Sequence, residues 1–311
     1  MERIGSLINR VGEYWKNRYG KKVYKLNFHG DFTCPNLDGT IGSEGCIYCN
    51  MKALEPLKDL DADSRIEDHM NYLKERNGAE AFIAYFQDYS STYPAHGVKD
   101  RLKYLEELYR KALSHPGIVG ISVSTRPDAV SKSELDILRS LNTDVTIELG
   151  LQTINEKDLD WIGRGHTVEQ FSTTVELVSS YGFETVAHII LGLPDETDTG
   201  IFDMARFLNN SKISGLKIHQ LMILKNSRLE KLYIEGKAPQ VLTETEYFRR
   251  LGILISHLKK DIVIHRLYAD APKKDLIAPL WCTNKTGIQD RIFKYFKENK
   301  IRQGSDLNYL S

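Results

Sequence analysis

Short apolar runs alternate with longer amphipathic segments along most of the chain. The short runs are rich in β-branched and aromatic residues, which favour extended structure. Seven of them predict strands at 23–28, 81–86, 118–123, 145–149, 185–190, 215–221 and 262–267. The longer segments repeat apolar residues at helical spacing and predict helices at 99–113, 132–141, 168–181, 198–210 and 244–259. Strands that alternate with helices indicate βαβ units and a parallel sheet.

The number of these units favours a barrel. Six or more units within about 220 residues are too many for a small flavodoxin-like sheet, so we expect a (β/α) barrel, complete or partial. Residues 1–20 are expected to form a leading helix, with Leu7, Val11 and Trp15 in its apolar stripe. The barrel is expected over residues 21–240. Residues 241–311 are expected to form a C-terminal α/β extension that ends in a basic helix near 286–300.

Composition narrows the class of protein. The 311 residues are 41% hydrophobic and 27% charged, which is typical of a globular protein. The 42 Lys and Arg residues balance 42 Asp and Glu residues, which excludes a histone-like grip on nucleic acid. The chain has no run of eighteen apolar residues and no signal-peptide pattern at Met1. We therefore expect a cytoplasmic protein without a membrane partner.

Three of the four cysteines crowd into one glycine-containing loop after the first predicted strand. They are Cys34, Cys46 and Cys49, and their thiolates can converge on one metal centre. A [4Fe–4S] cluster normally takes four cysteines, so three ligands leave one iron open for a small molecule. Structural zinc uses the same spacing and would take Cys282 or His29 as its fourth ligand. The thiols are also compatible with an inert, buried role.

Further motifs surround this loop. Tyr48 precedes the last cysteine directly, and eleven residues separate Cys34 from Cys46. Six more segments follow in order: Tyr85-Phe86-Gln87 with Ser90-Ser91-Thr92-Tyr93, Ser124-Thr125-Arg126-Pro127-Asp128, Glu148-Leu149-Gly150-Leu151-Gln152, Arg164-Gly165-His166-Thr167, Leu191-Gly192-Leu193-Pro194 and His265-Arg266-Leu267. Over about residues 20–285 these motifs resemble the radical SAM superfamily. The wide cysteine gap resembles its YhcC/YtqA-type branch, which is close to the Elongator catalytic subunit.

The resemblance implies a mechanism and a fold. Cys34, Cys46 and Cys49 would hold a [4Fe–4S] cluster whose open iron chelates S-adenosylmethionine (SAM). One electron, from a reductant such as flavodoxin or ferredoxin, would cleave SAM to methionine and a 5′-deoxyadenosyl radical. That radical takes a hydrogen atom from the substrate, and the protein supplies positioning and a dry cavity. The implied fold is a partial (β/α)6 TIM-like barrel, in which the strand ends converge on one mouth.

The resemblance also implies SAM contacts beyond Tyr48. Gln87 would accept a hydrogen bond from the methionine amino group, although an ordinary polar loop is an alternative. Ser124 stands where relatives often place a carboxylate, so this contact is weaker here or comes from another residue. Gln152 and Arg164 have the spacing of a pair that touches the SAM carboxylate and ribose. Gly192 would lie against the adenine, because a small residue permits close approach.

Several polar residues occupy predicted strands. Glu148 is expected either to face the barrel interior or to partner Arg126. His188, Lys217 and His219 alternate with apolar residues, so some of them must face the interior as candidates for the substrate pocket. A hydrogen-bonded core histidine is the commoner explanation for either histidine.

The substrate class stays open between two kinds of enzyme and a binding protein. The Elongator-like motifs imply tRNA, and the branch suggests remodelling of a carboxymethylaminomethyl group at C5 of the wobble uridine to aminomethyl. Basic residues near both ends support a small phosphate contact or are simply solvated; they are Lys21, Lys22, Lys25, Arg291, Lys294, Lys297, Lys300 and Arg302. A radical SAM enzyme for a small metabolite or porphyrin-like compound is the first alternative. A zinc-stapled binding protein is the second.

Overall fold

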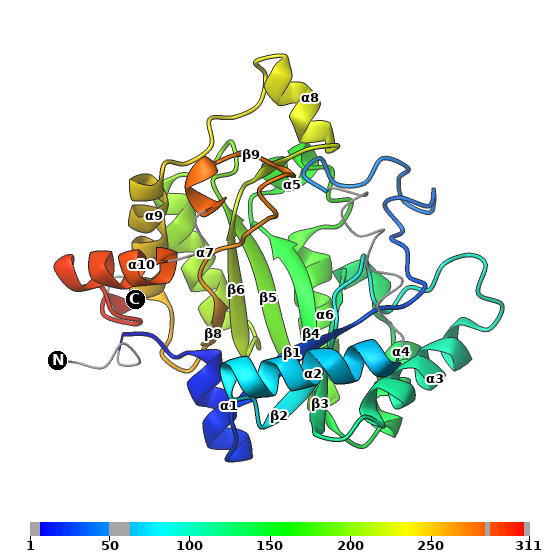
Figure 1. Ribbon diagram of the computed structural model, residues 1–311. Helices are drawn as coiled ribbons and strands as arrows, with labels where there is room; N and C mark the ends of the chain where they lie inside the picture. Colours follow the sequence, from blue (N-terminus) through cyan, green and yellow to red (C-terminus); the bar gives the residue numbers. More distant parts are fainter. Residues whose placement is uncertain (1–6, 50–62, 284–286, 308–311) are drawn as a thin grey trace.

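A curled parallel sheet forms the centre of the protein (Figure 1). The computed structural model describes residues 7–49, 63–283 and 287–307. Seven strands are hydrogen-bonded in the order β1-β2-β3-β4-β5-β6-β8. They are β1 (Val23–Phe28), β2 (Ala81–Phe86), β3 (Ile118–Thr125), β4 (Asp144–Gln152), β5 (Glu184–Leu191), β6 (Gly215–Gln220) and β8 (Val263–Arg266). All seven coincide with predicted runs, and the curled sheet confirms the α/β half-barrel.

Helices cover the outer face of the sheet, as βα connections require. Those that follow the strands are α2 (Asp63–Asn77), α3 (Arg101–Leu113), α4 (Lys132–Ser140), α6 (Val168–Ser180), α7 (Asp198–Asn210) and α9 (Glu244–His257). Side-chain caps fix several helix starts. Ser131 and Glu134 form the capping box expected at α4, and Thr167 and Gln170 form another at α6.

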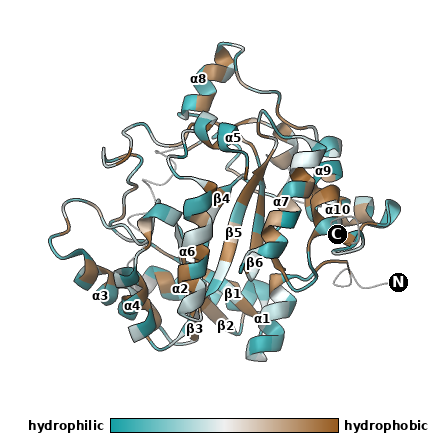
Figure 2. Cartoon of the chain, turned by 180° about the vertical axis from the view of Figure 1, so that it is seen from behind, coloured by the Kyte–Doolittle hydropathy of each residue, from teal (hydrophilic) through white to brown (hydrophobic). Residues whose placement is uncertain are grey.

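Alternation along each strand sorts side chains between the two faces of the sheet. Phe82 and Phe86 of β2 and Ile147 of β4 point outward into a large core under the helices. Hydrophobic colouring runs along the middle strands, whereas the helices turn hydrophilic residues outward (Figure 2). The residues between these apolar positions, such as Tyr85 and Glu148, face inward. A period of two therefore gives the strands one apolar and one polar face.

The leading segment closes one end of the half-barrel. Helix α1 begins at Val11 and ends at Tyr19, a shorter helix than the 1–20 expected. The side chain of Arg18 contacts Asp144 at 2.9 Å and Glu184 at 2.8 Å, where β4 and β5 begin. The backbone before α1 pairs with β8, because the Ile264 amide donates to the Asn9 carbonyl. Within the described residues, β1 and β8 are the outermost strands of the seven-stranded sheet, and α1 lies beside both.

The C-terminal part contributes to the sheet and adds a layer beside it. Strand β8, expected in the extension, pairs in parallel with β6. The expected basic helix is α10 (Ile288–Glu298), which buries Ile292, Phe293 and Phe296. Small elements that the sequence did not predict are α5 (Glu156–Trp161), α8 (Arg228–Ile234) and the antiparallel pair β7 (Ile223–Leu224) and β9 (Leu276–Ala278). No helix in the described ranges has the length and apolar character to cross a membrane.

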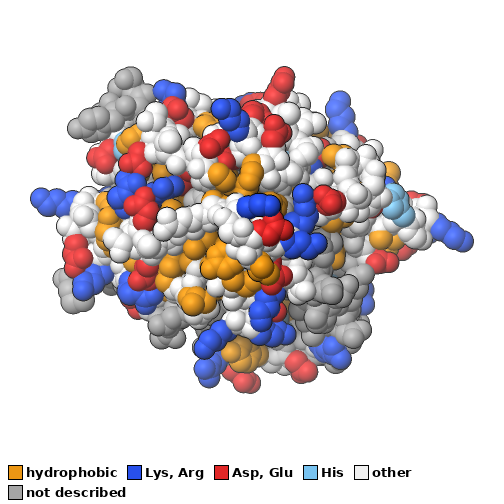
Figure 3. Space-filling view, turned by 90° about the horizontal axis from the view of Figure 1, so that it is seen from above, with side chains coloured by type: hydrophobic (Ala, Val, Ile, Leu, Met, Phe, Trp, Pro, Cys, Tyr) orange, Lys and Arg blue, Asp and Glu red, His pale blue; other side chains and the backbone are white. Residues whose placement is uncertain are grey.

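The face seen from above carries mixed charge. Figure 3 shows an apolar central area there, with basic and acidic side chains interspersed around it. This mixture agrees with the zero net charge of the chain. Any nucleic acid bound at this face would thus meet local cations instead of a broad basic surface.

Candidate active site

Backbone hydrogen bonds hold the cysteine loop at the carboxyl ends of the strands. The amide of Cys49 donates to the Cys46 carbonyl at 3.0 Å and forms a tight turn. Ile47 is fixed on both sides, since its amide donates to Ile162 and its carbonyl accepts from Leu229, each at 2.9 Å. The loop is therefore anchored to the end of α5 and the start of α8, elements that the sequence analysis missed.

Eight of the nine predicted site residues line one cavity of about 300 Å³. They are Cys34, Cys46, Tyr48, Cys49, Gln87, Ser124, Gln152 and Arg164. These residues come from the cysteine loop, from the ends of β2, β3 and β4, and from the segment after α5. Residues far apart in sequence thus meet at the mouth of the half-barrel, where enzymes of barrel type place their chemistry.

The cysteine cavity offers three thiols as possible metal ligands. Among the described residues, no three His, Cys, Asp or Glu side chains are close enough to share one metal. Tetrahedral zinc needs every sulfur at about 2.3 Å from the same ion. Neither suggested fourth zinc ligand lines the cavity: Cys282 donates to the Pro279 carbonyl at 3.0 Å, and His29 pairs with Asp88 at 2.7 Å. Three cysteines without a fourth protein ligand in the cavity suit a [4Fe–4S] cluster that leaves one iron open.

Arg164 supplies positive charge to the thiol cavity. Its guanidinium donates to Cys46 Sγ at 3.5 Å and to the Gly150 carbonyl at 3.0 Å. Burial raises the pKa of the Cys46 thiol, but Arg164 and then Arg126 outweigh burial, so the pKa is lowered. Burial raises the pKa of Cys49 to about 12, with help from Cys46 and Cys34. The charges of the cavity therefore act in opposite directions on the pKa values of these two thiols.

Two backbone features at the end of β4 shape the cavity. A side chain on Gly150 would place its Cβ 2.3 Å from Arg164 Nη2, so it would displace the guanidinium from its present position. Gln152 has a positive φ of 72°, and the pairing of β4 with β5 shifts register between Gly150 and Gln152. Non-glycine residues seldom adopt this conformation. The bulge thus turns the Gln152 side chain toward the cavity.

A second arginine of the cavity has an unused donor. Arg126 is 2% exposed and pairs with Asp128 through two hydrogen bonds of 2.8 and 2.7 Å. Its Nη1 is buried and has no hydrogen-bond partner among the described residues. An unpaired guanidinium nitrogen beside three thiols suits a group that carries a carboxylate. The cavity therefore fits an amino acid cofactor as well as a metal cluster.

Glu148 faces inward, the first of its two expected alternatives, while Arg126 pairs with Asp128 instead. Its carboxylate, which is fully buried, contacts the amines of Lys25 and Lys217 and accepts from Ser122 Oγ at 2.7 Å. Burial alone would raise the pKa of Glu148, but Lys217 and Lys25 hold it well below its usual range. Burial lowers the pKa of Lys25 to about 8. Lys25 is consequently an interior residue, and not part of a surface patch for phosphate.

Histidines extend this interior network. His188 Nε2 lies 2.8 Å from the Glu148 carboxylate, and its ring stacks on His219 with centroids 5.5 Å apart. Burial lowers the pKa of His188 to about 4 and that of His219 well below its usual value. Both rings are therefore neutral near pH 7. His219 lines the cysteine cavity and its buried Nε2 has no hydrogen-bond partner among the described residues.

Gly192 is the predicted site residue that the cysteine cavity does not include. It follows β5 with a positive φ of 95°, and its amide donates to Glu196 at 2.9 Å. It lines a separate cavity with Leu242 and Arg250. Sequence reasoning also left some cavity residues without a role, among them Tyr85, Gly150 and Arg266. All three lie inside the family-like motifs of the sequence, and this position could have identified them as candidate site residues.

Fold and cavity together define a half-barrel protein with a thiol-lined site at the carboxyl ends of its strands. The family model "Radical SAM superfamily" matches residues 39–208, and "Radical_SAM C-terminal domain" matches residues 213–298. The chain belongs to the radical SAM superfamily. The cofactors of this superfamily, a [4Fe–4S] cluster and SAM, are therefore those of the protein.

Relatives place the chain within the superfamily. It is 34% identical to Protein YhcC of Escherichia coli over 98% of this chain and 97% of that protein. It is 30% identical to Uncharacterized protein YtqA of Bacillus subtilis over 93% and 89%. The structure of Elp3 from Methanocaldococcus infernus superposes with a TM-score of 0.67 and 19% identity, over 90% of this chain and 64% of that one. Elongator complex protein 3 of Dictyostelium discoideum is 28% identical over 50% of this chain and 27% of its own length. The expected homology to the YhcC/YtqA branch and to Elongator is thus confirmed.

A more distant match carries a name that specifies a substrate. The tRNA uridine(34) acetyltransferase of Methanocaldococcus jannaschii is 24% identical over 59% of this chain and 34% of its own length. The match leaves most of that longer protein without a counterpart here.

Proposed function

We propose that the protein is a radical SAM enzyme that remodels the C5 side chain of the wobble uridine in tRNA, from carboxymethylaminomethyl to aminomethyl. The observation that carries this proposal is the homology to Elongator complex protein 3 and to the tRNA uridine(34) acetyltransferase. Both similarities are partial, so they support the substrate class and leave the acetyl transfer aside. The fold shared with Elp3 extends over 90% of this chain.

The proposal assigns the cluster to Cys34, Cys46 and Cys49. When bound, the cluster and SAM supply a 5′-deoxyadenosyl radical that removes a hydrogen atom from the substrate. Arg164 and Arg126 place positive charge and free donors beside the thiols, so they suit the SAM carboxylate. The other proposed SAM contacts are Tyr48, Gln87, Ser124, Gln152 and Gly192.

Ser124 occupies a position where related enzymes often carry a carboxylate that contacts SAM, so we assign it a different role. Its hydroxyl oxygen lies 3.1 Å from the Tyr85 hydroxyl and 3.3 Å from the Glu148 carboxylate, and it can donate its one proton to either. The hydroxyl is thus engaged with the interior network, whose carboxylate belongs to the neighbouring strand. We assign Glu148 and Ser124 together to the position where relatives carry one carboxylate.

The RNA contact is proposed for helix α10. Its apolar side is buried, while Lys294 is 75% exposed and Lys297 lines the outer surface beside it. Arg291 is not available for phosphate, because it pairs with Glu244 at 2.6 Å. A footprint of a few phosphates agrees with recognition of an unpaired loop.

The direct test is mass spectrometry of tRNA nucleosides. Reduced holoenzyme and SAM are incubated with undermodified tRNA, which is then digested. We expect loss of a carboxymethyl-sized mass from one modified uridine, matched by 5′-deoxyadenosine. Unchanged nucleosides, together with 5′-deoxyadenosine release triggered by a small metabolite, would replace tRNA by a small-molecule substrate.

The cluster assignment has its own test. Anaerobically reconstituted protein should absorb broadly near ~400 nm through thiolate-to-iron charge transfer. Replacing Cys34, Cys46 and Cys49 by alanine should abolish this absorbance. The matched control is Cys282→Ala, a buried thiol in the 3₁₀ helix Leu280–Thr283 outside the cavity, which should keep full iron content. Stoichiometric zinc without iron would contradict the assignment.

A further inference from the structure

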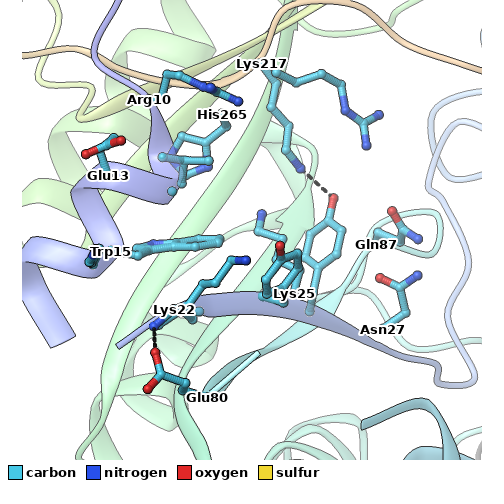
Figure 4. A pocket seen from close by; sticks show the side chains of 17 residues that line it. Arg10, Glu13, Trp15, Lys22, Lys25, Asn27, Glu80, Gln87, Lys217 and His265 are labelled. Carbon is cyan, nitrogen blue, oxygen red and sulfur yellow. Dashed lines mark hydrogen bonds between the residues drawn. The ribbon is translucent and has the colours of Figure 1, made fainter. Parts of the chain in front are cut away.

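A second and larger cavity adjoins the cysteine cavity. It has a volume of about 820 Å³ and lies between β1, β8 and α1, on the open side of the half-barrel. Tyr85, Gln87, Lys217 and Arg266 line both cavities, so one continues into the other. In Figure 4, Gln87 and Asn27 lie at one end of the second cavity, and Glu13 and Trp15 lie at the other. Its size is within the range of small-molecule and cofactor sites.

Cations dominate the lining of this cavity. They are Arg10, Lys16, Lys22, Lys25, Lys217 and Arg266, against the two carboxylates of Glu13 and Glu80. Glu148 offsets part of the excess, but Lys25 and Lys217 share that one carboxylate. Positive charge therefore remains in a concave site with protein walls, where fields are focused and anions are attracted.

Several of these groups have no counter-charge. Within the described residues, Arg10, Lys16 and Arg266 form no ion pair, although the Arg10 guanidinium lies 5.5 Å from the ring centroid of Phe293. His265 lines the same cavity, and its buried Nδ1 has no hydrogen-bond partner. A buried polar nitrogen without a partner is unusual unless a ligand or water completes it.

Arg266 belongs to the His265-Arg266-Leu267 motif, for which neither the cluster nor SAM provides a role. The structure fixes this motif firmly. Arg266 is in register with Lys217 of β6, and Tyr247 donates to the Leu267 carbonyl at 2.5 Å. Two further hydrogen bonds between Gln220 and Ala269 hold the chain that follows. The backbone therefore holds Arg266, which is exposed and has no ion pair among the described residues, at the junction of the two cavities, where its guanidinium is available to a bound anion.

We infer that this second cavity binds the substrate of the radical reaction, and that Arg266 and Arg10 hold an anionic group of that substrate, a phosphate or a carboxylate. The inference rests on the proposed function only in taking the cysteine cavity as the site of radical formation. Under the tRNA proposal, two sources supply the anion: the carboxylate on the modified uridine and the phosphate of its nucleotide. Guanidinium groups suit both, because they bind planar and tetrahedral oxyanions through paired donors.

The test measures binding of four probes to the reconstituted holoenzyme with SAM, by anaerobic calorimetry. The probes are uridine, uridine 5′-monophosphate, 5-carboxymethyluridine and inorganic phosphate. At least one anionic nucleoside should bind tenfold or more tightly than uridine, the gain typical of a charged hydrogen bond. Arg266→Gln and, separately, Arg10→Gln should remove most of that gain. Arg206→Gln, on the outer helix α7 and paired only with Asp203, should retain it.

The outcomes distinguish carboxylate from phosphate as the bound anion, and they test the anion site separately from the proposed tRNA substrate. A gain for 5-carboxymethyluridine alone assigns the carboxylate of the base, and a gain for the monophosphate alone assigns the phosphate. Binding of inorganic phosphate that is lost in Arg266→Gln, without any nucleoside preference, supports the anion site and contradicts the tRNA substrate. Equal binding of uridine and both anionic nucleosides, with no phosphate binding, overturns the inference. So does a gain that survives in both arginine variants. Cluster absorbance and the melting temperature confirm that each variant is folded.

Discussion

Strand β4 shows how differently the two faces of the sheet are built. On its outer face, Ile147 and Leu149 are fully buried in the core beneath the helices. On its inner face, between those two residues, Glu148 binds two lysines and a histidine. Closed TIM barrels usually fill their interior with branched apolar side chains. In this half-barrel the largest apolar core lies on the outside, and the inside combines the polar network with smaller apolar clusters, such as Trp15, Val23 and Ile83.

The difference implies that stability and function depend on different faces. Apolar packing on the outer face contributes free energy in proportion to the surface removed from water. A buried ion network contributes little net stability, because desolvation of the charges offsets their attraction. The inner network is therefore retained for positioning, and substitutions on the two faces should have distinguishable effects.

The largest expected effects compare Phe171 with Glu148. Phe171→Ala on α6 removes a fully buried ring and should lower the free energy of unfolding by about 3–5 kcal/mol. Glu148→Ala should cost a similar amount, about 3–5 kcal/mol, because two buried lysines lose their counter-charge. Urea unfolding measures both.

A combined variant separates the two causes. Replacing Lys25 and Lys217 by Met together with Glu148→Leu removes all three charges and should recover most of the stability, while substrate turnover stays lost. A triple variant as unstable as Glu148→Ala would make the network structural.

Arg164→Lys should come next in size. Lysine keeps the positive charge but loses the fork that reaches both Cys46 Sγ and the Gly150 carbonyl. SAM affinity should fall by roughly 1–3 kcal/mol, the range for a charged hydrogen bond. Equilibrium binding of SAM and 5′-deoxyadenosine production provide the measurement. Unchanged values for both would leave Arg164 with a purely structural role.

The pH dependence of the free energy of unfolding should reflect the ionisation of His188 on the inner face of the sheet. Burial holds the pKa of His188 at about 4 in the folded protein, against about 6.5 when unfolded. Between these values the unfolded state binds more protons, so stability is complete above pH 6.5 and falls as the pH drops toward 4. The slope should be about 1.4 kcal/mol per pH unit for this histidine.

His188→Asn should flatten that slope, because asparagine does not titrate. His257, a buried histidine of α9 outside the barrel interior, offers the matched control. His257→Asn should leave the contribution of the interior unchanged. An identical slope in wild type and His188→Asn would show that the ring is charged in the folded state.

The strands and most of the long helices could be predicted from the sequence, because each of them has its own local pattern of apolar residues. Every strand of the half-barrel carries a period-two run of β-branched or aromatic residues. Helix α2 was missed because its apolar stripe is sparse, with Ile66 and Met70 the buried members of a mostly polar segment. Helix α5 and strands β7 and β9 are too short to show any period.

The site was predictable to the extent that family motifs marked it. Eight residues selected by cysteine spacing and by their motifs near strand ends line one cavity in the structure. The partners of Glu148 were not predictable, because Lys25 and Lys217 lie on other strands, and alternation does not say which pairs meet. The positive φ of Gln152 also lacks a sequence signal, since glycine normally marks such positions. Long-range pairing and local strain therefore needed the structure.

The smallest expected effect concerns helix α10, which lies outside both faces of the sheet. Lys294 is exposed and only loosely paired with Glu298 at 3.8 Å, so Lys294→Gln and Lys297→Gln should not affect folding. If α10 contacts single-stranded phosphates, the slope of log affinity for tRNA against log salt should become shallower by about 0.7 for each contact removed. Filter binding over a range of salt concentrations measures this slope.

Because α10 lies outside the cysteine cavity, cluster absorbance should stay constant in both variants. The control is Lys212→Gln, which changes an exposed residue paired with Glu176. An unchanged slope would remove α10 from the RNA interface and leave the cationic cavity beside β8 as the place where anionic substrate is held.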